Sequence, residues 1–192
     1  IIDGSHVSYG NKLIGIASSG FHSNGYSLVR NVIKKQKLDL NSKPDFSDET
    51  LGQLLLKPTQ IYVNAVLNII KHYPIHAMSH ITGGGLVENM PRVLPKQCMA
   101  QIDTKAWQVP EIFKYIQSQG DIPEDEMWRV FNMGIGYVMV VSENDSEAIL
   151  HQLTAMNLKA HIIGEVIEKS DDENSQVRSV SYTHLRAHET RP

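Results

Sequence analysis

Short apolar segments rich in β-branched residues alternate with amphipathic segments along most of the chain. The apolar segments have the length and composition of buried strands. Between them, apolar residues recur at helical spacing, as in Leu28, Val29, Val32 and Ile33. Strands that alternate with helices restrict the chain to a layered α/β or α+β fold, with a mixed central sheet packed with helices. The predicted strands are KLIGIAS (12–18), IHAMSHI (75–81), QCMAQID (97–103), GYVMVVS (136–142) and KAHIIGEVIE (159–168).

Several helices are expected between these strands. One begins at about Asn24, and a second helical region, 49–72, is interrupted near Pro58. A later helix is expected to be capped by Asn144 or Asp145. Three further segments are expected to be helical, namely LVENM (86–90), PEIFKYIQSQG (110–120) and EDEMWRVF (124–131).

The two ends differ in character from the rest. The chain opens at Ile1 without an initiator Met, which indicates a fragment. We expect one domain over residues 1–169, followed by a polar linker and tail over 170–192. The last segment, RSVSYTHLRAHETRP (178–192), has no helical or strand periodicity and is interpreted as non-native.

Charge and cysteine content exclude several classes of function. A net charge of −3 over 192 residues provides no positive electrostatic potential to attract nucleic acid. No apolar run is long enough to span a bilayer and no signal peptide is visible, so no membrane partner is expected. The one cysteine, Cys98, lies in a predicted strand and is interpreted as a buried apolar residue. These features favour a cytoplasmic setting.

The first candidate binding segment is SSGFHSNG (18–25), at the junction of a strand and a helix. Gly20 permits an unusual backbone angle, and Ser23 and Asn24 are cap-forming residues. The free N–H groups of the helix, with the hydroxyls of Ser19 and Ser23 and the ring of His22, would form a seat for an anion. A well-capped helix without a ligand explains the pattern equally well.

Two other glycine-rich segments lie at junctions of the predicted elements. Gly83, Gly84 and Gly85 suggest the close approach of a ligand, and Arg92 could pair with phosphate or carboxylate. The alternative is a tight turn with a surface ion pair between Glu88 and Arg92. The third segment, FNMGIG (131–136), precedes a strand and is explained by close packing, a bulge or a turn.

Other common motifs are absent. There is no GxxxxGK[ST] loop and no GxGxxG between a strand and a helix. His76 and His80 would share one face of a strand, but no Cys or carboxylate cluster accompanies them, so no metal site is predicted. Neither catalytic residues nor a general base can be assigned from spacing.

Taken together, the segments resemble the C-terminal domain of the phosphoribosylformylglycinamidine cyclo-ligase (aminoimidazole ribonucleotide synthetase) family. The resemblance is carried by SSGFHSNGYSLVR, TGGGLVENMPRVLP and FNMGIG, and it extends to KPTQIYVNAVL and HAMSHITGGG. It covers residues 1 to about 168. The N-terminal, ATP-binding domain of that family would be absent from this chain.

This resemblance implies a chemistry. The enzyme would use ATP and Mg²⁺ to phosphorylate the formyl amide oxygen of formylglycinamidine ribonucleotide, and the amidine nitrogen would then close the ring. Homodimerisation is expected for the full-length enzyme, through the absent domain, and the fragment alone would be inactive. The residues implied to bind substrate or phosphate are Ser19, Gly20, His22, Ser23, Asn24, Gly83, Gly84, Gly85, Asn89, Arg92, Asn132 and Gly134.

Two alternatives remain open on the sequence alone. The chain could come from another ATP-using member of the wider superfamily, such as formylglycinamidine ribonucleotide synthetase or a small-molecule kinase. It could also be a non-catalytic ligand-binding domain.

Overall fold

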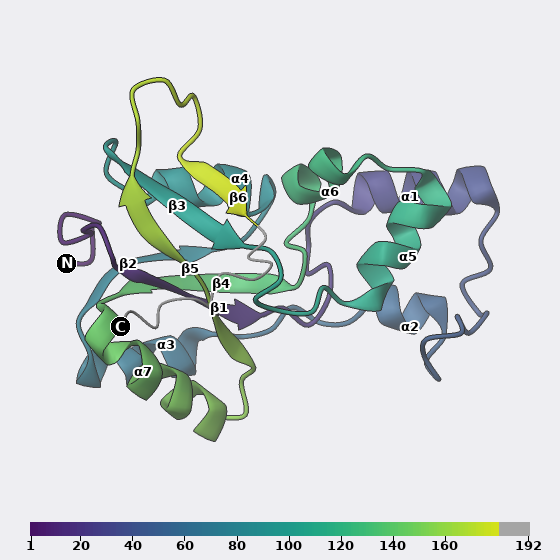
Figure 1. Ribbon diagram of the computed structural model, residues 1–192. Coiled ribbons are helices and arrows are strands. Elements are labelled where there is room, and N and C mark those ends of the chain that lie inside the picture. The colour runs from purple at the N-terminus through teal and green to yellow at the C-terminus, as the bar shows by residue number, and fades with distance from the viewer. Residues whose placement is uncertain (181–192) are drawn as a thin grey trace, which may run out of the picture.

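Six strands form a single sheet in the computed structural model, which describes residues 1–180 (Figure 1). The strand order is β2-β4-β1-β5-β3-β6, and neighbours run antiparallel except for β3 and β6, which are parallel. The predicted mixed central sheet is therefore confirmed. The strands are β1 (Lys12–Ala17), β2 (Ile75–His80), β3 (Cys98–Asp103), β4 (Ile135–Val141), β5 (Ala160–Glu168) and β6 (Val177–Val180).

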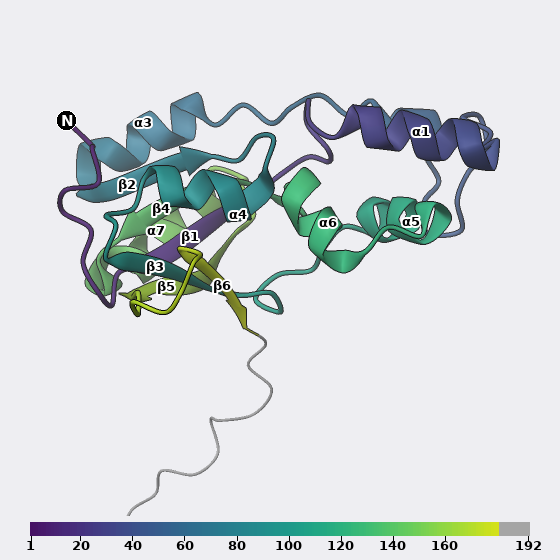
Figure 2. The ribbon, with the colours of Figure 1, turned by 90° about the horizontal axis from the view of Figure 1, so that it is seen from above.

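The helices are divided between the sheet and a separate lobe. In Figures 1 and 2, α3 and α7 cover one face of the sheet, α4 lies on the other, and α1, α2, α5 and α6 gather beyond the strand ends. We call this second group the helical lobe. The helices are α1 (Tyr26–Gln36), α2 (Leu51–Leu55), α3 (Val63–His72), α4 (Gly85–Asn89), the 3-10 turn η1 (Met90–Arg92), α5 (Glu111–Gly120), α6 (Glu124–Val130) and α7 (Glu143–Ala155).

The alternation of β-strand side chains gives the sheet two separate apolar cores. On β1, Leu13 packs with Leu86 and Met90 on the α4 side. Its neighbour Ile14 packs with Ile69 of α3 on the opposite side. Because successive side chains of a strand point to opposite faces, an apolar run such as KLIGIA must be covered on both sides.

The helical lobe has its own core, built around three phenylalanines. The Phe21 ring lies 4.5 Å from that of Phe113 and 5.0 Å from that of Phe131, measured between centroids. All three side chains are buried. These rings come from three different segments, so they join α5 to two of the glycine-rich segments, 18–25 and 131–136.

Two predicted helix starts are wrong. The N-cap of α7 is Ser142, whose hydroxyl accepts a hydrogen bond from the Asp145 amide, and neither Asn144 nor Asp145 has this role. Helix α1 begins at Tyr26 after Gly25, and no side chain caps it. In both cases several cap-forming residues stand close together, and the position of the first helical turn decides whether one of them caps the helix.

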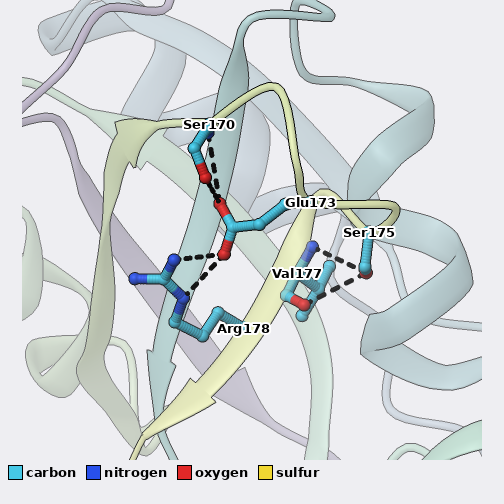
Figure 3. A network of polar contacts seen from close by, with 5 residues as sticks. All are labelled: Ser170, Glu173, Ser175, Val177 and Arg178. Atoms are coloured by element: carbon cyan, nitrogen blue, oxygen red, sulfur yellow. Dashed lines mark hydrogen bonds and ion pairs between the residues drawn. The ribbon is translucent and has the colours of Figure 1, made fainter.

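The last strand lies beyond the predicted end of the domain. Residues 177–180 pair with β3, and the preceding loop is held by Glu173, which accepts hydrogen bonds from Ser170 and forms an ion pair with Arg178 (Figure 3). Ser175 exchanges two hydrogen bonds with the Val177 backbone. The boundary at residue 169 and the non-native character of the tail stay predictions, and residues 181–192 lie outside the described residues.

The prediction that Cys98 is a buried residue is confirmed. Cys98 opens β3 and is 2% exposed, and burial raises the pKa of its thiol. A buried, protonated thiol is a poor nucleophile.

Candidate functional site

The first junction connects β1 to α1 through an irregular loop. Gly20 has a φ of 150°, which confirms the predicted unusual backbone angle. The Ser19 hydroxyl donates to the Pro58 carbonyl at 2.5 Å, and the exposed Ser23 hydroxyl lies 3.4 Å from that of Thr59. The loop therefore packs against a second segment, residues 57–60, just before α3.

His22 is the most unusual side chain of this loop. It has a φ of 58° and is 4% exposed. Its Nε2 accepts hydrogen bonds from the backbone amides of Ser19 (3.1 Å) and Gln60 (3.4 Å). Burial, with a smaller contribution from His80, lowers the His22 pKa to about 4. The ring is thus neutral near pH 7, and its proton lies on Nδ1 because Nε2 is an acceptor.

This Nδ1 has no hydrogen-bond partner within residues 1–180, and it is buried. A buried donor without a partner costs about 1–3 kcal/mol. Such a group in a native structure calls for an explanation, and a bound ligand is one.

The second junction connects β2 to α4 through three glycines. Gly85 has a φ of 59°, and a Cβ there would lie 2.7 Å from the Phe131 carbonyl oxygen, so only glycine fits. By contrast, a Cβ on the exposed Gly83 would meet only the Asn24 side-chain oxygen, at 3.6 Å. Gly83 therefore faces the first junction with room beside it.

Asn89 holds this turn together. Its side-chain nitrogen donates to the carbonyl oxygens of Thr82, Gly83 and Gly85, and its oxygen accepts from the Thr82 hydroxyl. The Asn89 side chain is 3% exposed. Its observed contacts are those of a residue that fixes the shape of the glycine turn.

The third junction precedes β4 and is centred on Asn132. The Asn132 oxygen accepts from the Ser18 hydroxyl (2.9 Å) and the Gly134 amide (2.8 Å), and its nitrogen donates to the Gly20 carbonyl (2.8 Å). The side chain is 3% exposed. Asn132 thus ties the third junction to the first.

These contacts bring the three glycine-rich segments together. The first and third share the Asn132 network, and the second touches the first at Gly83 and the third at Gly85. The close packing expected of FNMGIG is also present, since a Cβ on Gly136 would lie 2.6 Å from the His22 ring.

Within residues 1–180, the Arg92 side chain forms no hydrogen bond or ion pair with these three segments. It ends η1 on an exposed surface, eight residues after Gly84. The alternative pairing is absent as well, since within residues 1–180 no ion pair joins Glu88 to Arg92.

Two cavities flank the converged segments. One of about 450 Å³ is lined by His22, Ser23 and residues of α1, α2 and 56–59. Another of about 450 Å³ contains Ser18 and Gly134 on its wall, together with Lys159 and His161. The predicted residues therefore lie close together, but they line two separate cavities.

A cluster of aromatic and imidazole rings, which the sequence-based interpretation missed, lies beside His22. The Tyr62 hydroxyl donates to the Ala17 carbonyl at 2.8 Å, and its ring lies 5.9 Å from His80 and 5.3 Å from Tyr137. His22 lies 6.1 Å from Tyr62. Tyr62 lies in the segment KPTQIYV. Residue spacing along the chain does not show that this segment folds beside His22, so the sequence provides no reason to include Tyr62 in the site.

Two features are absent from residues 1–180. Across residues 1–180, no group of three or more His, Cys, Asp or Glu side chains is placed to hold a metal ion. None of the helices in the same range is both long and apolar enough to cross a membrane.

Comparison with known proteins settles the family. A family model described as AIR synthase related protein, C-terminal domain, matches residues 8–174. The chain belongs to this family. The phosphoribosylformylglycinamidine cyclo-ligase of Desulfotalea psychrophila is 51% identical over 177 residues, and that of Geotalea daltonii is 52% identical over 167. These matches cover 92% and 86% of this chain but 49% and 48% of the two relatives, so the chain spans about half their length.

Solved structures share the fold of this AIR synthase related domain at low identity. Thiamine-monophosphate kinase from Stenotrophomonas maltophilia matches with a TM-score of 0.63 at 14% identity, over 93% of this chain and 52% of that one. PurL of T. maritima matches in complexes with AMPPCP (TM-score 0.54, 12% identity, 94% and 24% covered) and with FGAR (0.57, 13%, 95% and 27%). These likenesses confirm the layered fold.

Proposed function

We propose that this chain is the C-terminal half of an ATP-dependent ligase that cyclises formylglycinamidine ribonucleotide to aminoimidazole ribonucleotide. The observation that carries the proposal is the convergence of the three glycine-rich segments around His22. It is supported by about 50% identity to relatives named phosphoribosylformylglycinamidine cyclo-ligase.

The proposed reaction needs ATP because an amide oxygen is a poor leaving group. Transfer of a phosphoryl group to that oxygen turns it into a phosphate, which leaves when the amidine nitrogen attacks the same carbon. The residues of this chain would bind and orient the substrate, which holds the reacting nitrogen close to the carbon. We assign neither a nucleophile nor a general base to them.

Within the proposed site, the predicted residues divide into two roles. His22, Ser23, Asn24 and Gly83 would contact the substrate, because His22 and Ser23 line a cavity and Asn24 and Gly83 face each other between the first and second junctions. Asn89 and Asn132 would hold the loops in position, because their side chains form hydrogen bonds with backbone groups of these loops. We propose the same shaping role for Ser19, Gly20, Gly84, Gly85 and Gly134. A contact between Arg92 and the substrate stays a prediction.

We propose that ATP binds mainly to the half of the polypeptide outside this chain. The AMPPCP complex of T. maritima PurL supports nucleotide use by a protein of this fold. Mg²⁺ would also bind mainly to that other half, since residues 1–180 hold no group of three or more His, Cys, Asp or Glu side chains placed for a metal ion. No step is therefore assigned to the metal in this half. We further propose a cytoplasmic, homodimeric enzyme that acts without nucleic acid or membrane.

Identity favours the cyclo-ligase over the alternative functions. The kinase and PurL structures share only 12–14% of their residues with this chain, whereas the cyclo-ligases share about half. The cyclo-ligase is therefore the function we put forward.

The test is an assay of the longer polypeptide, in which this chain is joined to the other half found in its relatives. We expect ATP-dependent formation of aminoimidazole ribonucleotide, and a fall in kcat/KM of about 100-fold in His22→Asn, as for a lost interaction of about 2.7 kcal/mol. Asn144→Ala, on the exposed side of α7, is the matched control and should retain full activity. Phosphorylation of thiamine monophosphate without ring closure would overturn the proposal.

A further inference from the structure

A groove in the helical lobe extends the candidate site beyond the residues predicted from sequence. Its volume is about 450 Å³, and it lies between α1, α2 and the segment that leads to α3. We call its apolar lining residues the floor and its polar lining residues the rim. The lining residues are His22, Ser23, Tyr26, Val29, Arg30, Ile33, Leu40, Gly52, Leu55, Leu56, Lys57, Pro58 and Thr59.

The charged groups of the lining are all basic. Arg30, on the second turn of α1, is exposed and forms no ion pair or hydrogen bond with another side chain within residues 1–180. Lys57 pairs with Glu49 at 2.8 Å, but both side chains are 40% exposed or more. Such a surface pair contributes about 0–1 kcal/mol and exchanges easily for a stronger partner.

Uncharged donors lie beside these cations. The hydroxyls of Ser23 and Thr59 lie 3.4 Å apart at the rim. The buried Nδ1 of His22, a side chain that also lines the groove, has no partner in the described part of the chain. A ligand oxygen would satisfy this donor and remove the cost of leaving it unpaired.

This set of groups matches one chemical class of ligand. A phosphate monoester has three acceptor oxygens and a charge close to −2 near pH 7, and a guanidinium binds it through two parallel hydrogen bonds. The apolar floor, formed by Val29, Ile33 and Leu55, would cover the uncharged part of the same molecule.

We propose that Arg30 binds the phosphate monoester of the substrate in this groove, with Ser23, Thr59 and the His22 Nδ1–H as further donors. The proposal rests on the proposed function for the identity of the substrate. It adds Arg30 as a cation that recognises the phosphate, beside the predicted contact of Arg92. Lys57 adds a second positive charge at the rim.

The test uses the 192-residue chain with ribose 5-phosphate and inorganic phosphate as probes. Isothermal titration should detect both, with ribose 5-phosphate the tighter because it also covers the floor. Arg30→Gln should weaken binding of both by at least 10-fold. Arg129→Gln, on the exposed face of α6 and outside the groove, is the matched control and should leave binding unchanged.

Three outcomes separate this proposal from the proposed function. Unchanged binding in Arg30→Gln, at unchanged circular dichroism, overturns the phosphate assignment. Ring closure by the longer polypeptide with an unaltered KM in Arg30→Gln also overturns it, while the cyclo-ligase function stands. Arg30-dependent binding of ribose 5-phosphate without any ring closure supports the groove and refutes the cyclo-ligase.

Discussion

At the scale of single residues, His22 shows how burial sets the chemistry that a side chain can perform. Its Nε2 is committed to two backbone amides, and its low pKa keeps the ring uncharged at neutral pH. The ring can therefore donate one hydrogen bond through Nδ1, but it provides no positive charge. In the proposed site, recognition of an anion would then depend on the neighbouring cations Arg30 and Lys57.

The His22 pKa predicts a dependence of stability on pH. The folded value is about 4 and the ordinary value is 6.5, so the unfolded chain binds more protons between these two values. Stability is then greatest above pH 6.5 and falls as the pH falls towards 4, by about 2 kcal/mol between pH 7 and pH 5. Urea unfolding of the wild type and of His22→Asn at both pH values measures this. Asn tolerates the positive φ of this position.

Other histidines set the background for that measurement. Burial also lowers the pKa values of His76 and His161, so some loss of stability at pH 5 will persist in the His22→Asn variant. The expected result is a smaller loss than in the wild type. An equal loss in both proteins would show that His22 is not the group responsible.

Asn132 predicts a second effect at the residue scale, on stability alone. Asn132→Ala removes three hydrogen bonds and leaves the Gly20 carbonyl and Gly134 amide without this partner. We expect a loss of about 2–4 kcal/mol in the free energy of unfolding. The matched control, Asn144→Ala, should lose less than about 0.5 kcal/mol because that side chain is exposed. Equal losses would mean that the Asn132 network is not what joins the two junctions.

At the scale of helices and turns, the cap of α7 can be tested directly. The Ser142 hydroxyl accepts from the Asp145 amide at 3.2 Å. Ser142→Ala should cost about 1 kcal/mol, because one amide of the first turn loses its acceptor. The alternative caps suggested by the sequence, Asn144 and Asp145, predict the opposite order. Thermal unfolding of Ser142→Ala and Asn144→Ala decides between them, and a larger loss in Asn144→Ala would contradict the assignment.

The glycine turn before α4 can be tested by substitution, because a side chain would clash at Gly85 but not at Gly83. Gly85→Ala combines a positive φ with a clash against the Trp128 and Phe131 carbonyl oxygens, so a loss of about 3 kcal/mol or more is expected. Gly83→Ala meets no atom closer than 3.6 Å and should keep the fold. Urea unfolding measures both variants. A stable Gly85→Ala variant would show that the turn can rearrange.

These elements also show what could be predicted from the sequence. Runs of apolar residues identify β1 to β5. A strand that is buried under helices needs apolar side chains regardless of which strands pair with it. The position of a cap among Ser142, Asn144 and Asp145 depends on a shift of two or three residues, which spacing does not determine. The same is true of the site. Loop composition points to His22 and Gly83. Arg30 is added only because α1 and residues 57–59 line the same groove, and the role of Arg92, which ends η1, stays a prediction.

At the scale of the whole molecule, the helical lobe is built from two insertions into the sheet. One follows β1 and contains α1 and α2, and the other follows β3 and contains α5 and α6. Both insertions begin or end at the glycine-rich junctions, so the candidate site lies where the lobe meets the sheet (Figure 2). A change in the packing of the lobe would then alter the groove beside Arg30 without changing the sheet.

Separate cores predict that the lobe opens independently of the sheet. Phe113→Leu perturbs the lobe core and Ile69→Val perturbs the core between β1 and α3, and each should cost about 1–2 kcal/mol. Hydrogen exchange followed by mass spectrometry should show faster exchange in α1, α5 and α6 for Phe113→Leu, with β1 and β4 unchanged, because local units open with their own free energies. Ile69→Val is the matched control and should accelerate exchange in the strands. Equal acceleration of both regions by Phe113→Leu would mean that lobe and sheet unfold as one unit, and that the groove cannot move on its own.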